Sequence, residues 1–315
     1  MIVVIVCHVE PGYATNRSVI FDNCRQGLIE GVKNTILISD RLGARVSFMM
    51  MPKVLQAFAG FDFMNHEVGL HIHPGDLLLM NEGLGGSHQP LREYDLEEQR
   101  NMISSGKRLV SDSLGVTPRT FVAGNWSVGN ETVRALVGLG FTHDASGCPQ
   151  FFSGSCDWRK LPRICMPYRP SRQDYQKNGD MEITMVPVSM EITGGIIGPE
   201  NDAGLRFLRA ALYEYVDLGV PLVHIAFHSA AMTSPRYRKV FGQLLEWMSE
   251  LDANFHPLSE VQPMRVEIPP NARRLSRYLM NADASALSFV LLRTIKNPRN
   301  ALEKLRRQFV QQRFM

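Results

Sequence analysis

The segment HEVGLHIHPGD (66–76) contains two histidines, His71 and His73, two residues apart at the end of an apolar run. Alternate side chains of a strand point to the same face, so both imidazoles would project to one side. Two imidazoles and one carboxylate are a common ligand set for Zn²⁺ and similar divalent cations. Glu10, which follows the first apolar run, is the candidate carboxylate. We therefore predict a divalent metal site, with zinc as the expected ion, formed by Glu10, His71 and His73.

A two-residue histidine spacing is a weak motif on its own. A lone histidine at a strand end more often makes structural hydrogen bonds, and Glu10 alone is as compatible with capping a helix or pairing with an arginine. The metal site is favoured because the carboxylate and both imidazoles lie at the ends of strand-like runs.

A further pair of histidines lies in the segment HIAFHSAAM (224–232). His228 is at the tip of a late apolar run, where it could act as a general acid that protonates a leaving group. The alternative is a hydrogen bond from His228 to a neighbouring loop. His224 has the same strand parity and is expected to face the interior as a buried polar residue.

Apolar, strand-like runs alternate with helix-like stretches along most of the chain. The runs are 2–10, 45–51, 66–74, 120–125, 141–146, 163–168, 183–190 and 221–229, and the main helical stretches are 20–42, 94–114, 130–140, 201–218 and 235–252. This alternation predicts an α/β fold with a parallel sheet covered by helices, either a barrel or doubly wound. Functional side chains of such folds lie at the carboxyl ends of the strands. The polar residues at those ends are His8, Glu10, His71, His73, Asn125, His143, Asp144, His228 and Ser229.

The composition is that of an ordinary globular protein, with 44% hydrophobic and 21% charged residues in 315. Five cysteines at no metal-like spacing argue against a disulfide framework and favour a reducing compartment. The N-terminal apolar run lacks a basic flank and is too short for a signal peptide, and no segment reaches the roughly 18 apolar residues of a spanning helix. We expect a cytoplasmic protein.

Positive charge is concentrated in the C-terminal tail. From residue 265 onward there are 11 Lys and Arg against 3 Asp and Glu, a charge of +8, which leaves −5 for the rest because the net charge is +3. Residues 286–315 have an apolar stripe at helical spacing with basic residues around it. Such a helix suits an anionic membrane surface at the inner face of the membrane, or packing on the barrel or on a partner subunit of a homo-oligomer. No nucleic-acid-binding motif accompanies the charge, which argues against nucleic acid as a partner.

Six segments, in order along the chain, carry a resemblance to a known family: VCHVEP, HEVGLHIHP, PRTFVAGNWSVGNETVRALVGLGFTHDAS, PYRPS, VPVSMEI and IAFHSAAM. Their order is similar to that of the polysaccharide deacetylase family, the NodB-homology or carbohydrate esterase 4 group, and in particular to its WbmS-like O-antigen-cluster branch. The resemblance covers roughly residues 1–260. Its most specific pieces are HEVGLHIHP and the spacing FxAGxxSxxxxTxxxLxxLGFxxDxS.

The resemblance implies a distorted (β/α) barrel of the NodB type, to which we assign residues 1–262. The tail lies outside the resemblance, and its charge and spacing predict a basic helical extension over 263–315. The resemblance also implies a divalent metal, usually zinc, that activates water for attack on the amide carbonyl of an N-acetyl sugar. Carried over to this chain, Glu10 is the metal-binding carboxylate and His71 the first metal histidine. His228 matches the late-strand acid that protonates the leaving amine.

The position of the second metal-binding histidine differs from the family pattern. The family places it four residues after His71, where this chain has Gly75. His73 is the available replacement, and Asp76 is a fallback oxygen ligand.

The residue at the position of the catalytic base also differs from the family pattern. The family's base aspartate falls at His8, whose imidazole, with an ordinary pKa near 6.5, could serve as a base or as a further metal ligand. The arginine that orients the base falls at Val122, and Arg119 is expected at the opposite end of that strand.

Asn125 and Trp126 are the predicted substrate-binding residues. They follow the fourth strand-like run, where an indole and polar groups suit stacking against a sugar ring; the alternative for Trp126 is packing in the core or a loop. A later segment contains residues that could line a groove for a nucleotide- or lipid-phosphate-linked sugar, or form a solvated loop: Asp157, Trp158, Arg169 and Arg172.

These observations predict a metal-dependent hydrolase that removes an acyl group, typically acetyl, from an N-acylated sugar in polysaccharide or O-antigen metabolism. His8 and His228 are the expected catalytic residues. The alternative is a catalytically impaired barrel that binds a glycan or a partner enzyme, which His8 and Val122 favour. An amidohydrolase-type enzyme ranks third, because its His-x-His pair belongs on the first strand rather than the third.

Overall fold

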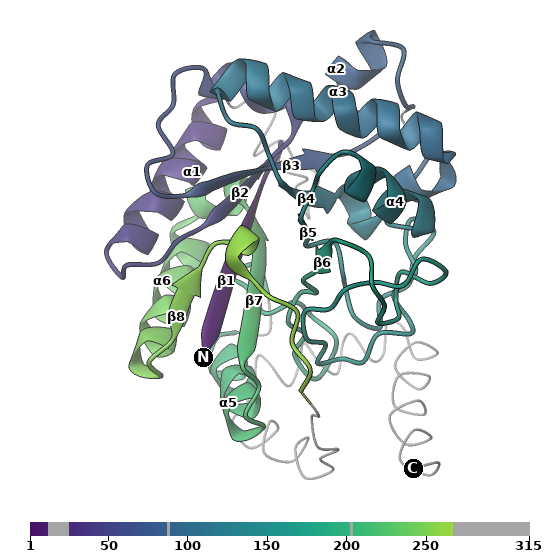
Figure 1. The fold of residues 1–315 in the computed structure, drawn as a ribbon. Coiled ribbons are helices and arrows are strands. Elements are labelled where there is room, and N and C mark those ends of the chain that lie inside the picture. Colours follow the sequence, from purple (N-terminus) through teal and green to yellow (C-terminus); the bar gives the residue numbers. More distant parts are fainter. Residues whose placement is uncertain (12–24, 87–88, 202–203, 267–315) are drawn as a thin grey trace.

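The computed structural model describes residues 1–11, 25–86, 89–201 and 204–266 (Figure 1). The strands are β1 (Ile2–Val9), β2 (Ser47–Met50), β3 (Glu67–Ile72), β4 (Thr120–Ala123), β5 (His143–Asp144), β6 (Thr184–Met185), β7 (Leu222–His228) and β8 (Asn254–His256). The helices are α1 (Arg25–Asp40), α2 (Leu77–Asn81), α3 (Leu96–Leu114), α4 (Asn130–Gly138), α5 (Leu205–Asp217) and α6 (Pro235–Glu250).

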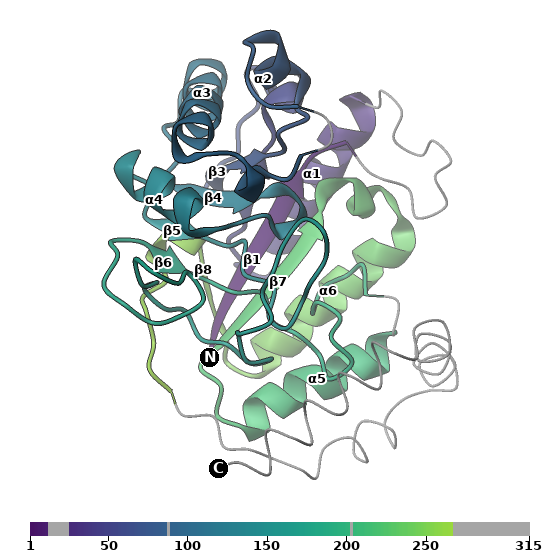
Figure 2. The ribbon, with the colours of Figure 1, turned by 90° about the vertical axis from the view of Figure 1, so that its right-hand side faces the viewer.

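All strand pairs in the sheet are parallel, in the order β6-β5-β4-β3-β2-β1-β7, and β8 pairs with the first residues of β1. The segment after β6 joins the two ends of this order, because the Ser189 N–H donates to the His224 carbonyl of β7 at 3.0 Å. The strands therefore curve into a distorted barrel, and the predicted α/β barrel class is confirmed. Figure 2 shows α5 and α6 on one side of β1 and β7, with the long segment after β5 on the other.

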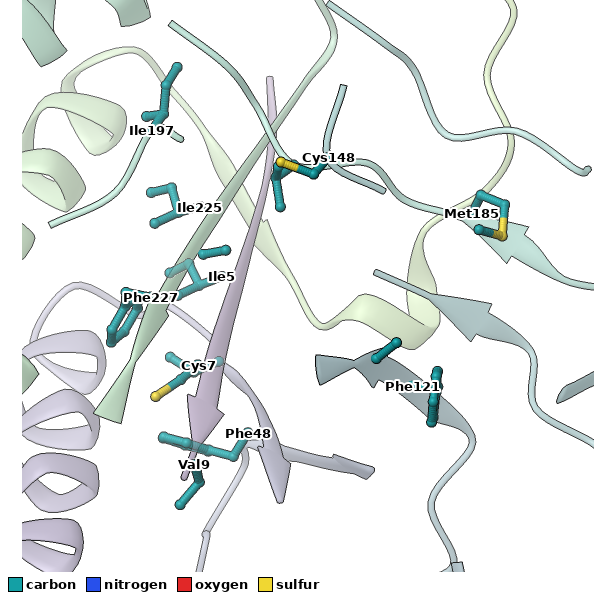
Figure 3. Packing of buried hydrophobic residues seen from close by; sticks show 14 of the residues in the cluster. Ile5, Cys7, Val9, Phe48, Phe121, Cys148, Met185, Ile197, Ile225 and Phe227 are labelled. Atoms are coloured by element: carbon teal, nitrogen blue, oxygen red, sulfur yellow. The ribbon is translucent and has the colours of Figure 1, made fainter. Parts of the chain in front are cut away.

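Strand alternation divides β1 between two environments. Its odd-numbered side chains, such as Ile5 and Cys7, pack with Phe227 of β7 in the apolar layer that also includes helix residues (Figure 3). Its even-numbered side chains, Val4 and Val6, belong to a separate interior cluster. Since the period of a strand is two, the same inner face continues upward to residues 8 and 10.

Helix α3 begins and ends at local sequence signals. The Asp95 carboxylate accepts from the Glu98 N–H before α3, while the Glu98 carboxylate accepts from the Asp95 N–H, both at 2.9 Å. This reciprocal pair is a capping box. It explains why the helix that the sequence predicts over 94–114 begins at residue 96 in the structure. The helix stops at Gly115, whose φ of 69° lies in the left-handed region that glycine adopts without strain.

The chain after β8 closes the amino-terminal end of the barrel. Leu258 and Val261 join the interior cluster, and the Val261 carbonyl lies 2.7 Å from Nε2 of His143. His143 therefore lies at the end of the barrel opposite Glu10, together with Arg119, which lines a groove there. The prediction that His143 shares the carboxyl-terminal rim is wrong, because β5 is only two residues long and begins at this histidine.

Other sequence predictions differ from the structure in extent. The run 163–168 forms only an isolated bridge between Tyr168 and Met185, since Pro162 precedes it and Pro167 lies within it, and a proline cannot donate a ladder hydrogen bond. Most of the predicted extension 263–315, including the amphipathic stretch 286–315, lies outside the described residues. Within the described part of the chain, none of the helices combines the length and apolar character required to cross a bilayer.

Asp144 is a buried carboxyl group in β5. Its Oδ1 accepts hydrogen bonds from the N–H and hydroxyl of Ser146, whereas Oδ2 has no hydrogen-bond partner among the described residues. Burial raises the pKa of Asp144 to about 7. An unfolded aspartate ionises near pH 3.9, so the native state keeps a proton that the unfolded chain loses between about pH 4 and 7. The contribution of Asp144 to stability therefore falls as the pH rises through this window.

We predict that Asp144→Asn, which keeps the acceptor for Ser146 but cannot ionise, stabilises the protein more at pH 8 than at pH 5. The unfolding free energy of Asp144→Asn minus that of the wild type should be about 2 kcal/mol larger at pH 8 than at pH 5. Urea unfolding measures both values. Asp62→Asn, at an exposed aspartate, is the control and should show no such pH dependence. The same stability difference at both pH values for Asp144→Asn would contradict the prediction.

Candidate metal centre

The structure brings Glu10, His71 and His73 together at the carboxyl end of the barrel. Nε2 of His71 lies 3.1 Å from Oε2 of Glu10, and Nε2 of His73 lies 2.9 Å from the same oxygen. One ligand atom from each of the three residues lies within 4.8 Å of the others. Glu10 and His71 are buried and His73 is nearly so, which shields the cluster from water.

The tautomer of His71 makes this cluster suitable for a cation. Its Nδ1 lies 3.0 Å from the Val122 carbonyl, which can only accept, so Nδ1 carries a proton. Burial lowers the pKa of His71 in spite of the Glu10 carboxylate, which favours the neutral ring. Nε2 of a neutral His71 then directs its lone pair toward a carboxylate oxygen. Two facing acceptors repel, and a divalent cation bound by both removes that repulsion.

Glu10 remains ionised although it is buried. Burial alone would raise the pKa of its carboxyl group, but hydrogen bonding, led by that of His228, holds that pKa well below its ordinary value. Among the described residues, no lysine or arginine forms an ion pair with Glu10. The donor set, one carboxylate with imidazole nitrogens, therefore fits a divalent cation of the zinc type.

Gly124 makes room for His73. It follows β4 directly, and a Cβ atom at this position would lie 2.4 Å from Nδ1 of His73. That separation is shorter than real Cβ contacts, so any side chain at 124 would displace the imidazole. The absence of a side chain at residue 124 is thus part of what positions the second histidine.

His8 lies beside the three ligands but outside the group that they form. Its ring centroid is 4.9 Å from that of His71 and 5.3 Å from those of Trp126 and His228. Burial, together with the neighbouring imidazoles, lowers the pKa of His8 well below its ordinary value. Its Nε2 is buried and has no hydrogen-bond partner in the described structure. His8 is therefore a neutral imidazole packed against the ligand cluster.

His228 links the cluster to a carboxylate that sequence reasoning missed. Its Nδ1 lies 2.9 Å from Oε2 of Glu200, which also accepts from the His228 backbone N–H at 2.7 Å, and its Nε2 lies 3.2 Å from Oε1 of Glu10. Burial alone would lower the pKa of His228, but the charges of Glu200 and Glu10 raise it well above its ordinary value. A proton on the His228 ring is therefore strongly favoured.

The segment that carries Glu200 crosses β7 at close range. A Cβ atom on Gly198 would lie 2.5 Å from the Ala226 carbonyl, so glycine permits the contact. Upstream, the fully buried Glu191 carboxylate accepts from the N–H groups of Thr193 and Gly195. The Gly- and Pro-rich stretch GGIIGPE (194–200) was the available signal, but it indicates only an irregular segment and no partner for its glutamate.

Asn125 and Trp126 lie at the same rim, in the turn that follows β4. Asn125 is exposed, and Trp126 is half-buried with its ring against His8. The structure thus places both predicted substrate-binding residues beside the candidate metal ligands.

Other sequence candidates have structural partners elsewhere. The Asp76 carboxylate caps α2 by accepting from the Leu78 N–H, and it also accepts from the Lys53 N–H, so it is not a free oxygen ligand. His224 is fully buried and its Nδ1 lies 3.0 Å from the Val186 carbonyl, as expected of an interior polar residue. Trp158 is also fully buried and therefore does not line a groove.

Comparison with known proteins supports the architecture. No family model and no curated protein matches the chain. An inferred polysaccharide deacetylase from Mycobacterium smegmatis is 18% identical, with a TM-score of 0.50 over 84% of this chain and 94% of its own. The fold is the distorted barrel of the NodB type. The Puue allantoinase structure is 11% identical, with a TM-score of 0.53 over 81% of this chain and 86% of its own. At such identities the similarity establishes the NodB-type barrel alone.

We predict that Gly124→Ala lowers the affinity for Zn²⁺ by about tenfold or more, because the new methyl group displaces the His73 imidazole. Isothermal titration with zinc at pH 7 measures the effect. Gly138→Ala is the matched control, since a Cβ atom there meets no atom within 4 Å. Equal zinc affinity in the Gly124→Ala variant and the control would show that His73 does not bind the ion.

Proposed function

We propose that the protein is a metal-dependent hydrolase that removes an acyl group, typically acetyl, from the nitrogen of an N-acylated sugar. The observation that carries the proposal is the convergence of imidazole nitrogens of His71 and His73 on the buried carboxylate of Glu10. A divalent cation held there, for which zinc is the expected ion, supplies a Lewis acid for an amide carbonyl and lowers the pKa of water.

His228 is the proposed acid. The Nδ1–H of His228 donates a hydrogen bond to the Glu200 carboxylate, and Nε2 is the nitrogen of His228 that faces the ligand cluster. The raised pKa of His228 keeps a proton available at neutral pH. Transfer of the Nε2 proton to the sugar nitrogen would allow the amine to leave as the C–N bond breaks.

His8 is the proposed base, in the position where the resembling family has an aspartate. Because its ring is neutral, a nitrogen lone pair is available, and Nε2 has no partner among the described residues. That atom can take up the proton released by the attacking water. The lowered pKa makes His8 a weak base, so we expect slow hydrolysis rather than a fast enzyme.

The proposed substrate is a carbohydrate bound beside Asn125 and Trp126, since an indole face suits an apolar sugar face. We place the activity in polysaccharide or O-antigen metabolism, on a lipid- or nucleotide-linked sugar met in the cytoplasm at the inner face of the membrane. The order of motifs along the chain supports this context.

One further function is favoured by a specific observation. His8 has a depressed pKa and Val122 stands where an arginine would orient the base, so the barrel could bind a glycan or a partner enzyme without hydrolysis. In that case the protein binds metal and glycan but releases no amine, and the double replacement His8→Asp with Val122→Arg creates activity.

We expect one divalent ion per chain in protein purified without chelator, measured by inductively coupled plasma mass spectrometry. His71→Ala should reduce both the metal content and the amine released from N-acetylated sugar oligomers by at least about tenfold. His256→Ala, at a partly exposed histidine outside the cluster, is the control. Protein that contains no ion and takes up no added zinc would rule out the hydrolase.

We predict that Glu200→Gln reduces kcat by about ten- to a hundredfold, because it removes the charge that keeps the proton on His228. The zinc affinity should stay unchanged, since Glu200 is not a ligand. Glu246→Gln, at an exposed glutamate of α6, is the control. An unchanged kcat in Glu200→Gln would exclude His228 as an acid supported by this carboxylate.

A further inference from the structure

The turn after β4 has an unusual backbone. Asn125 and Trp126 are consecutive and both have positive φ angles, of 54° and 58°. Asparagine adopts the left-handed region readily, but for a bulky residue such as tryptophan it is a strained conformation. Strain of this kind persists only where the surroundings hold the backbone in place.

Trp158 provides such a constraint. Its indole Nε1–H donates to the Trp126 carbonyl at 2.9 Å. Trp158 is fully buried in the segment after β5, where its ring meets that of Tyr175 at 5.0 Å in an edge-on arrangement. Its own backbone is fixed, because its N–H donates to the Phe151 carbonyl and its carbonyl accepts from the Gln150 N–H.

The Trp126 carbonyl accepts from both the Trp158 indole N–H and, at 3.1 Å, the Val128 N–H, and it is the indole that depends on this acceptor. A buried indole N–H without an acceptor would destabilise the fold, and the Trp126 carbonyl is the acceptor that it has. The ends of the turn are held separately, since the Ser127 N–H donates to the Gly124 carbonyl and the Arg92 N–H donates to the Ser127 hydroxyl. The contact with Trp158 therefore acts on the strained residue itself.

The orientation of Trp126 matters to the site because its ring lies against His8, with ring centroids 5.3 Å apart and planes at 57°. A change of residue 126 to a right-handed backbone would redirect its Cα–Cβ bond and move the indole. Among the described residues, the Trp158 side chain forms no hydrogen bond or ring contact with the metal ligands or with His8, so any influence on the site passes through Trp126.

We propose that Trp158 is a positioning residue, whose indole N–H holds Trp126 in its left-handed conformation and thereby fixes the Trp126 ring against His8 at the substrate side of the site. The role in substrate binding rests on the proposed hydrolase function. The structural coupling between the two tryptophans does not.

The test uses the full chain labelled with 5-fluorotryptophan, because its three tryptophans give three ¹⁹F resonances. Single Trp→Phe variants assign them. Trp158→Phe keeps the aromatic ring against Tyr175 but removes the N–H donor. We expect the Trp126 resonance to shift or broaden, while that of Trp247 in α6 stays in place. Trp247→Phe is the matched control and should leave the Trp126 resonance unchanged. An unchanged Trp126 resonance in folded Trp158→Phe overturns the inference.

Kinetics separate this proposal from the proposed function. In active protein, Trp158→Phe should raise KM for the N-acetylated sugar about fivefold or more and leave the zinc affinity unchanged. An unaltered KM would overturn the role at the substrate side. If the wild-type protein binds zinc but releases no amine, the hydrolase proposal fails. The ¹⁹F spectra still test whether Trp158 positions Trp126.

A measurement on the wild-type chain covers the case in which Trp158→Phe does not fold. Hydrogen exchange of the three indole N–H groups should then be slowest for Trp158. Exchange of the Trp158 indole as fast as that of a solvent-exposed indole would overturn the inference.

Discussion

The site depends on the burial of one ionised carboxylate, that of Glu10, at the carboxyl end of the barrel. A charge removed from water must be compensated, and no lysine or arginine among the described residues pairs with Glu10. Imidazoles approach both of its oxygens instead: His71 and His73 at Oε2, and His228 at Oε1. Imidazoles can compensate this charge either by carrying protons or by sharing a cation with it.

His71 and His228 compensate the charge in these two different ways. The Val122 carbonyl and burial keep His71 neutral, with its Nε2 lone pair toward Glu10. Glu200 has the opposite effect on His228, because its charge keeps the ring protonated. The same carboxylate is thus bordered by a neutral ring suited to bind a cation and by a charged ring suited to donate a proton.

Much of this arrangement follows from strand parity, which is why the sequence could predict it. Even-numbered residues of β1 face the barrel interior, so the apolar Val4 and Val6 are followed on the same face by His8 and Glu10. The β3 pair follows the same rule. Local alternation therefore predicted the parallel α/β sheet and the convergence of Glu10 with the histidines, whereas the barrel itself was predicted from the family resemblance.

Features that depend on irregular backbone escaped prediction. Glu200 reaches His228 through a segment without regular structure, and no periodic pattern indicates where such a segment crosses the barrel. The left-handed backbone of Trp126 contradicts the local preference of tryptophan, and its carbonyl accepts a tertiary hydrogen bond from Trp158 that no local pattern indicates. His143 was misplaced because the shortness of β5 cannot be read from an apolar run.

The most direct test of the account is anomalous X-ray scattering from crystals grown with zinc, recorded on both sides of the zinc absorption edge. The account predicts one peak at the carboxyl end of the barrel, within about 2.0–2.2 Å of ligand atoms of Glu10, His71 and His73, with His8 outside that distance. The absence of a peak between these three residues, or a peak coordinated by His8 in place of one of them, would contradict it.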